Sequence, residues 1–94
     1  MPETYPEQNP RAAWRVYEGE AVIVSPADST LHTLNAVGTV IWEAADGRTA
    51  MDAIVGRVCD VFEVDRATAA RDTAVFVDAL RRRGLLTVLD TPKA

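Results

Sequence analysis

The sequence predicts an α+β domain in which a three-stranded antiparallel β-meander precedes three helices. Two observations carry this prediction. Apolar residues lie in short strand-like segments between residues 14 and 34, whereas from residue 35 onward they recur with a period of about 3.6 residues. The chain has 94 residues, 48% of them hydrophobic and 26% charged, which suits one small domain.

Three short segments have the residue types of β-strands. Residues 14–17 are rich in aromatic and β-branched side chains, and a tight turn follows at Gly19, where positive φ costs little. A nearly all-apolar segment comes next at 21–25, and a cluster of turn residues at 26–29 separates it from residues 30–34. We therefore expect the first and third segments to be the edge strands of the meander, with the apolar segment between them.

Cap residues mark the ends of the three predicted helices. Asn35 is a good N-cap for the first helix, which we expect to end at Gly47. The second helix is expected over residues 49–62. Asp65 caps the third helix, and Gly84 ends it. This order of strands and helices resembles a winged helix-turn-helix.

The folded unit is expected to span residues 11–89, with a short extended segment at 86–89. The first ten residues contain three of the five prolines and little to bury, so residues 1–10 are predicted to be a flexible N-terminal tail. Residues 90–94 are predicted to be a flexible C-terminal tail.

The composition argues against an enzyme and against a metal site. The single histidine, His32, is interpreted as a cross-strand neighbour, and the single cysteine, Cys59, as a small buried hydrophobe. No catalytic residue, metal ligand or cofactor is therefore predicted, and no internal disulfide can form. No apolar run approaches the roughly 18 residues of a membrane span and no signal peptide is evident, so we expect a cytoplasmic protein with no membrane partner.

An ordered set of short motifs runs along residues 14–89. After an apolar strand it comprises Leu34-Asn35, Val40-Ile41-Trp42, Asp46-Gly47-Arg48-Thr49, Ile54, Phe62, Val64, Asp72, Phe76-Val77, Leu80 and Gly84-Leu85-Leu86. In this order and spacing the motifs resemble the PqqD-like family, which is named for the chaperone of pyrroloquinoline quinone biosynthesis. Its fold is also called the RiPP recognition element, after the ribosomally synthesised and modified peptides that it serves.

The resemblance implies a non-catalytic peptide chaperone or adaptor. Such a domain binds the leader segment of a ribosomally synthesised precursor peptide and presents it to a modifying enzyme, such as a radical S-adenosylmethionine enzyme. The resemblance also implies that the peptide adds to the third strand, in a groove beside the third helix. The residues agree with this mode, because residues 30–34 end the meander and contain no proline or lysine that would block pairing at an edge.

Two sets of residues are therefore predicted to bind the peptide. The first is the edge strand, with Thr30, Leu31, His32, Thr33 and Leu34. The second is one flank of the third helix, favoured because small side chains leave room for another chain, with Ala70, Arg71, Ala74, Val77 and Arg81. The opposite flank remains an alternative, with Thr68, Asp72, Val75 and Ala79.

The charge distribution leaves several alternatives open. Five arginines and two aspartates lie between residues 66 and 83, which favours an acidic client peptide, although arginines at 81–83 also offset the helix dipole. The net charge of −4 argues against a nucleic-acid partner. A DNA-binding winged helix-turn-helix protein is nevertheless the alternative function, and the open strand edge also allows a homodimer.

Overall fold

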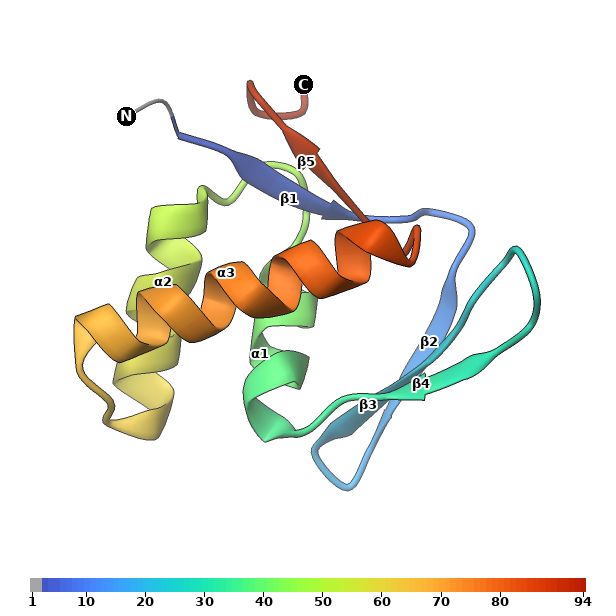
Figure 1. Cartoon of the computed structure of the whole chain (residues 1–94), viewed down its shortest axis with the longest axis horizontal. Coiled ribbons are helices and arrows are strands. Elements are labelled where there is room, and N and C mark those ends of the chain that lie inside the picture. Colours follow the sequence, from blue (N-terminus) through green and yellow to red (C-terminus); the bar gives the residue numbers. More distant parts are fainter. Residues whose placement is uncertain (1–2) are drawn as a thin grey trace.

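The computed structural model describes residues 3–94, and its strands form two antiparallel sheets (Figure 1). One sheet has two strands in the order β1-β5, and the other has three in the order β2-β3-β4. The elements are, in chain order, β1 (Tyr5–Gln8), β2 (Ala13–Tyr17), β3 (Glu20–Val24), β4 (Leu31–Thr33), α1 (Ala36–Ala44), α2 (Met51–Phe62), α3 (Arg66–Arg82) and β5 (Leu86–Leu89).

The predicted meander and its three following helices are confirmed. The hairpin between β2 and β3 has a two-residue turn in which Glu18 and Gly19 both have positive φ, 52° and 82°. This turn geometry matches the right-handed twist of the paired strands. Strand β4 is one residue shorter at each end than the predicted segment 30–34.

The N-terminal caps of α1 and α3 are those expected from the sequence. The side chain of Asn35 accepts a hydrogen bond from the N–H of Gly38 at 2.8 Å, and that of Asp65 accepts one from the N–H of Thr68 at 3.3 Å. Each bond satisfies a backbone donor that the first turn of the helix leaves free.

The C-terminal ends agree with the sequence at α3 but not at α1. Gly84 follows α3 with a φ of 75°, and the N–H of Leu85 donates to the carbonyl of Leu80 at 3.0 Å, which is the bonding of a Schellman motif. Helix α1 instead ends at Ala44, so the predicted end at Gly47 is corrected. Gly47, with a φ of 77°, belongs to the loop that joins α1 to α2.

The predicted N-terminal tail, residues 1–10, contains strand β1, which pairs with β5. The carbonyl of Pro6 accepts a hydrogen bond from the N–H of Gly47 at 2.8 Å, and that of Thr4 accepts one from Met51 at 2.8 Å. Pro6 is itself fully buried. The folded unit therefore begins before the predicted boundary at residue 11. Proline disfavours strands on average, but it is tolerated here because each strand of a two-stranded sheet has an unpaired edge.

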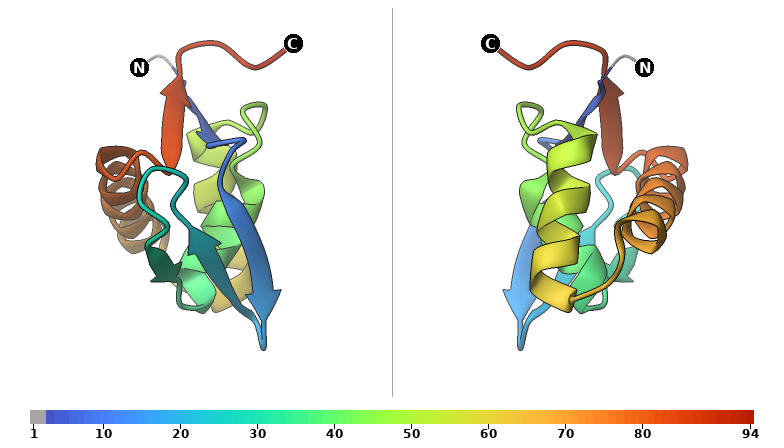
Figure 2. Two further views of the ribbon diagram at one scale, coloured as in Figure 1. Left: turned by 90° about the vertical axis from the view of Figure 1, so that its right-hand side faces the viewer. Right: turned by 90° about the vertical axis from the view of Figure 1, so that its left-hand side faces the viewer.

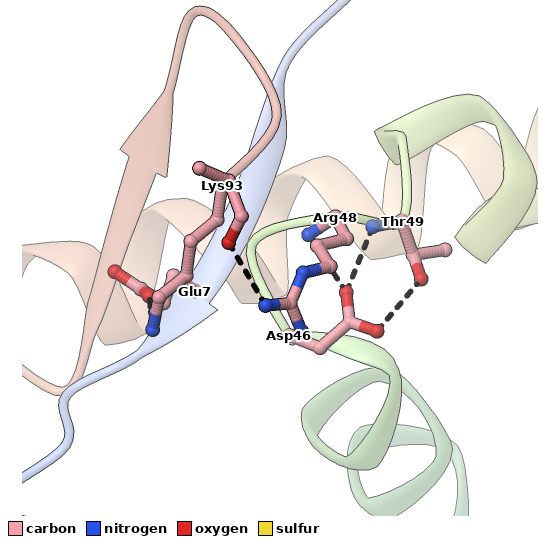
Figure 3. A network of polar contacts seen from close by, with 6 residues as sticks. Glu7, Asp46, Arg48, Thr49 and Lys93 are labelled. Atoms are coloured by element: carbon pink, nitrogen blue, oxygen red, sulfur yellow. Dashed lines mark hydrogen bonds and ion pairs between the residues drawn. The ribbon is translucent and has the colours of Figure 1, made fainter.

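The predicted C-terminal tail, residues 90–94, also makes specific contacts, with β1 and with the loop between α1 and α2 (Figure 3). The N–H of Lys93 donates to the carbonyl of Gly47 at 2.8 Å, and the Nζ of Lys93 lies 2.7 Å from the Oε2 of Glu7. The two ends of the described chain are thus joined side by side, on the part of the molecule away from the meander (Figure 1).

The core lies between the meander and the helices, which cover one face of the sheet (Figure 2). Ile23 and Trp42 are fully buried there. The Trp14 ring meets Trp42 edge-on, with 6.0 Å between centroids and an interplanar angle of 87°. Trp42 is therefore a central core residue, whereas Trp14 is 39% exposed.

Candidate functional site

Strand β4 lies at an edge of the meander, with β3 on one side and no strand on the other among residues 3–94. The N–H of Leu34 donates to the carbonyl of Ala21 on the β3 side at 2.8 Å. Backbone groups alternate in direction along an antiparallel strand, so those of His32 also point to β3. The N–H and C=O groups of Leu31 and Thr33 point away from the sheet and form its open edge.

The same alternation identifies the open groups of β2, at the opposite edge of the meander. Ala21 directs its carbonyl to the β4 side, so Val22 directs its backbone groups to β2, where it pairs with Arg15. The backbone groups of Trp14 and Val16 therefore point outward. The protein thus has two chemically similar open edges, of which β4 alone lies beside α3 (Figure 2).

Side chains on β4 alternate between the two faces of the sheet. His32 pairs with Ile23, which is fully buried, so the imidazole lies on the face that the helices cover. Leu31 and Thr33 lie on the outer face, where Leu31 is 65% exposed. None of these residues is a proline or a lysine, the types that usually prevent pairing at an edge strand.

The C-terminal end of α3 forms a wall beside this edge. The Nη1 of Arg83 lies 3.5 Å from the Nδ1 of His32, which joins the end of α3 to the middle of β4. The left view of Figure 2 shows β4 as the strand of the meander next to α3. A chain paired with the open edge of β4 would therefore also contact α3.

A pocket of about 400 Å³ lies farther along α3, where this helix passes the beginning of α1. Its mainly apolar lining comprises Asn35, Val37, Gly38, Ile41, Asp72, Val75 and Phe76. The two helices approach closely at Gly38, where an added Cβ would lie only 2.7 Å from the Cε2 of Phe76. Asn35, which lines the pocket, lies two residues after the end of β4, so the pocket begins close to that end of the strand.

This pocket is lined by residues of the alternative flank of α3 and not by those of the predicted flank. Asp72 and Val75, from the alternative flank, line the pocket, and Val75 is 64% exposed. Val77, from the predicted flank, is instead part of the core at 3% exposure. The other predicted residues of α3 do not line this pocket: Ala70, Arg71, Ala74 and Arg81. An apolar stripe predicts which side of a helix is buried, but two flanks lie equally near that stripe and the sequence does not separate them.

Sequence reasoning missed Arg83 and five residues that line the pocket: Asn35, Val37, Gly38, Ile41 and Phe76. The structure places the half-buried ring of Phe76 at the wall of the pocket. Gly38 carried a usable signal, because a glycine inside a helical pattern often marks a close approach of another element. The role of Arg83 depends on the tertiary arrangement of α3 and β4, which no local pattern reveals.

Most of the positive charge near α3 is neutralised by neighbouring carboxylates. Asp78 lies 2.7 Å from Arg81 and 3.0 Å from Arg82, and the hydrogen bond from Arg81 lowers the pKa of the Asp78 carboxyl. The remaining ion pairs of α3 are Arg66–Asp52 and Arg71–Asp72. No carboxylate of the described chain lies within ion-pair distance of Arg83, so this arginine keeps its charge available.

The described residues offer few other functional groups. Across residues 3–94, no cluster of three or more histidine, cysteine, aspartate or glutamate side chains could hold a metal ion. None of the helices in this range has the length and apolar character that crossing a membrane requires. The candidate site is thus a strand edge with an adjacent groove, an architecture suited to binding an extended peptide.

The sequence matches the family model described as "Coenzyme PQQ synthesis protein D (PqqD)" over residues 20–86. The chain therefore belongs to the PqqD family, which confirms the resemblance seen in its motifs. Comparison with curated proteins finds no significant match.

Two solved structures have a similar fold. The first, "TbiB1 in Complex with the TbiA(beta) Leader Peptide", is 29% identical with a TM-score of 0.78, over 85% of this chain and 93% of that chain. The second, "Lasso peptide synthetase B1 complexed with the leader peptide", is 19% identical with a TM-score of 0.73, over 87% of this chain and 96% of that chain. Both were solved with a leader peptide bound.

Proposed function

We propose that this protein binds the leader segment of a ribosomally synthesised precursor peptide and presents it to a modifying enzyme. The leader adds as a fourth strand to the edge of β4 and lies in the groove between β4 and α3. Main-chain hydrogen bonds to Leu31 and Thr33 supply affinity, and side chains that enter the groove supply register. Membership of the PqqD family and the leader peptides bound in both similar structures support this function.

The observation that carries the proposal is the open edge of β4 beside a groove. A strand edge exposes N–H and C=O groups that an extended chain can pair with, and the edge of β4 is neither blocked by proline nor covered by another strand of the described chain. The pocket of about 400 Å³ next to this edge can accept an apolar side chain of the leader. The edge of β2 lies on the side of the meander away from α3, so a chain paired there would not reach this pocket (Figure 2).

A pair of proline variants tests the proposal. Thr33→Pro removes an outward N–H at the edge of β4, and Val16→Pro removes one at the edge of β2, while both leave the hydrogen bonds inside the meander in place. The open reading frames beside this gene are searched for a precursor peptide, and binding of its synthetic leader segment is followed by isothermal titration calorimetry. We expect Thr33→Pro to abolish binding and Val16→Pro to preserve it.

Circular dichroism and thermal unfolding serve as the control that both variants remain folded. A folded Thr33→Pro protein that binds the leader with wild-type affinity would refute docking at this edge. Equal loss of binding in both variants would show that the effect is general destabilisation of the sheet.

The alternative of a DNA-binding protein has no support in the comparisons, and the ion pairs of α3 weaken it further. A recognition helix needs free positive charge near phosphates, whereas Arg66, Arg71 and Arg81 each have a carboxylate partner. The proposed role involves no catalysis by this chain alone. A modifying enzyme as partner remains a prediction, as does a homodimer, which would compete with the leader if it used the edge of β4.

A further inference from the structure

We propose that Arg83 and His32 form a carboxylate-binding subsite in this groove, so that the preferred peptide carries Asp or Glu at the position opposite His32. The inference rests on the proposed function and adds to it the chemistry of one recognised side chain. No other part of the described groove combines an available cation with a hydrogen-bonding ring.

The position of the subsite follows from the geometry of a paired strand. Residues that lie opposite each other on neighbouring strands place their side chains on the same face of the sheet. His32 directs its ring to the helix-covered face, as its pairing with the buried Ile23 requires. The peptide side chain opposite His32 would therefore project between β4 and α3, where the guanidinium of Arg83 lies 3.5 Å from the imidazole.

Charge selects a carboxylate for this position. Among the arginines of α3 and its C-cap, Arg83 has no carboxylate within ion-pair distance in the described chain, whereas Arg81 and Arg82 both pair with Asp78. A guanidinium presents parallel N–H donors that match the two oxygens of a carboxylate, and the imidazole can contribute another hydrogen bond. A peptide carboxylate would thus complete an interaction that the free protein leaves unmade.

The other end of the groove selects a different side chain. The pocket at the beginning of α1 is mainly apolar, and its charged residue is Asp72, which disfavours a second acid there. Arg83 and Phe76 are seven residues apart on α3, which corresponds to about 10 Å along a helix and about three residues along a strand. Side chains on the same face of a strand are an even number of residues apart, so we expect the acidic and apolar residues to be two or four positions apart.

A selection experiment tests this pattern and does not require the natural client peptide. The probe is a phage-displayed library of random twelve-residue peptides, selected in parallel on the wild-type protein, Arg83→Gln, Arg82→Gln and Thr33→Pro. Arg82→Gln is the matched control, because it removes the same charge from the neighbouring residue, which pairs with Asp78.

We expect peptides enriched on the wild type and on Arg82→Gln to carry Asp or Glu two or four positions from an apolar residue. The acidic preference should disappear on Arg83→Gln. For one enriched peptide, fluorescence anisotropy should give about a fivefold loss of affinity with Arg83→Gln, the size of a favourable ion pair near a protein surface. Replacing the peptide's Glu by Gln should cause a similar loss, and combining both changes should add little.

The outcomes separate the two proposals. Two results would overturn the carboxylate subsite and leave strand addition intact. In the first, the enriched peptides fail to bind Thr33→Pro but show no preference for Asp or Glu. In the second, the acidic preference is the same on Arg83→Gln as on the wild type. A library that yields no peptides, or only peptides that bind Thr33→Pro equally well, would overturn the proposed function and the subsite together.

Discussion

At the scale of single residues, two buried threonines differ in their hydrogen bonds. The Oγ1 of Thr39 in α1 accepts a hydrogen bond from the N–H of Ala21 at 2.8 Å, which fastens α1 to the beginning of β3. The Oγ1 of Thr73 in α3 is buried and has no partner in the described chain. The Thr39 hydroxyl therefore satisfies a buried donor, whereas burial of the unpaired Thr73 hydroxyl lowers the free energy of unfolding.

We predict opposite effects of the same substitution at these two positions. Thr39→Val leaves the N–H of Ala21 buried and unpaired, which should lower the free energy of unfolding by about 1–3 kcal/mol. Thr73→Val removes a hydroxyl that gains nothing from burial, so stability should stay the same or rise. Urea unfolding of both variants measures the difference, and an equal loss of stability in the two would contradict this account.

Asp46 is the second residue with a distinct role, because it organises the loop between α1 and α2 (Figure 3). Its Oδ1 accepts hydrogen bonds from the N–H groups of Arg48 and Thr49, both at 2.8 Å, and its Oδ2 accepts one from the Thr49 hydroxyl at 3.2 Å. These bonds, above all the one from the Arg48 backbone, hold the pKa of Asp46 below its ordinary value of 3.8. They favour the charged form of the carboxyl in the folded state.

A lowered pKa in the folded state predicts the sign of the pH dependence. The contribution of Asp46 to stability should be complete above pH 3.8 and should be lost as the pH falls from there through the lower folded pKa. Asp46→Asn keeps an oxygen acceptor but cannot titrate, so its unfolding free energy should depend less on pH in this range. Asp60→Asn, on the exposed surface of α2, provides the control, and an identical pH dependence in Asp46→Asn and wild type would contradict the prediction.

At the scale of elements, strand β1 links parts of the chain that are far apart in sequence. It pairs with β5, its residue Gln8 donates from Nε2 to the carbonyl of Trp42 at 2.8 Å, and the backbone N–H of Gln8 donates to Ala45 at 3.0 Å. The carbonyls of Thr4 and Pro6 hold the loop after α1 and the start of α2. The strand thus positions α1 and α2 against each other without contributing to the proposed site.

Removal of residues 1–8 should therefore destabilise the fold and spare the binding surface. Each hydrogen bond lost contributes about 1 kcal/mol, so the loss of these bonds, together with the exposure of β5, should lower the unfolding free energy by several kcal/mol. Differential scanning calorimetry should show a lower midpoint, and leader binding measured well below that midpoint should remain. An unchanged midpoint would mean that β1 adds nothing to the stability of the fold.

At the scale of the whole molecule, the sequence predicted the order of strands and helices better than it predicted the boundaries of the folded unit or the details of the groove. The switch in apolar period and the caps at Asn35, Asp65 and Gly84 are local signals, and the meander, the helices and the end of α3 follow from them. Strand β1 could not be predicted in this way, because Pro6 is held by pairing with distant residues. The flank of α3 that faces β4 depends on how the helix is rotated against the sheet, which is likewise a tertiary property.

The measurement that tests the central claim most directly is amide hydrogen exchange by NMR, with and without a saturating leader peptide. The account predicts that the amides of Leu31 and Thr33 exchange rapidly in the free protein and become protected in the complex. The outward amides of Trp14 and Val16 on β2 should remain rapid in both states. If the Leu31 and Thr33 amides are already protected in the free protein, or stay unprotected when the leader is bound, the peptide does not dock on this strand.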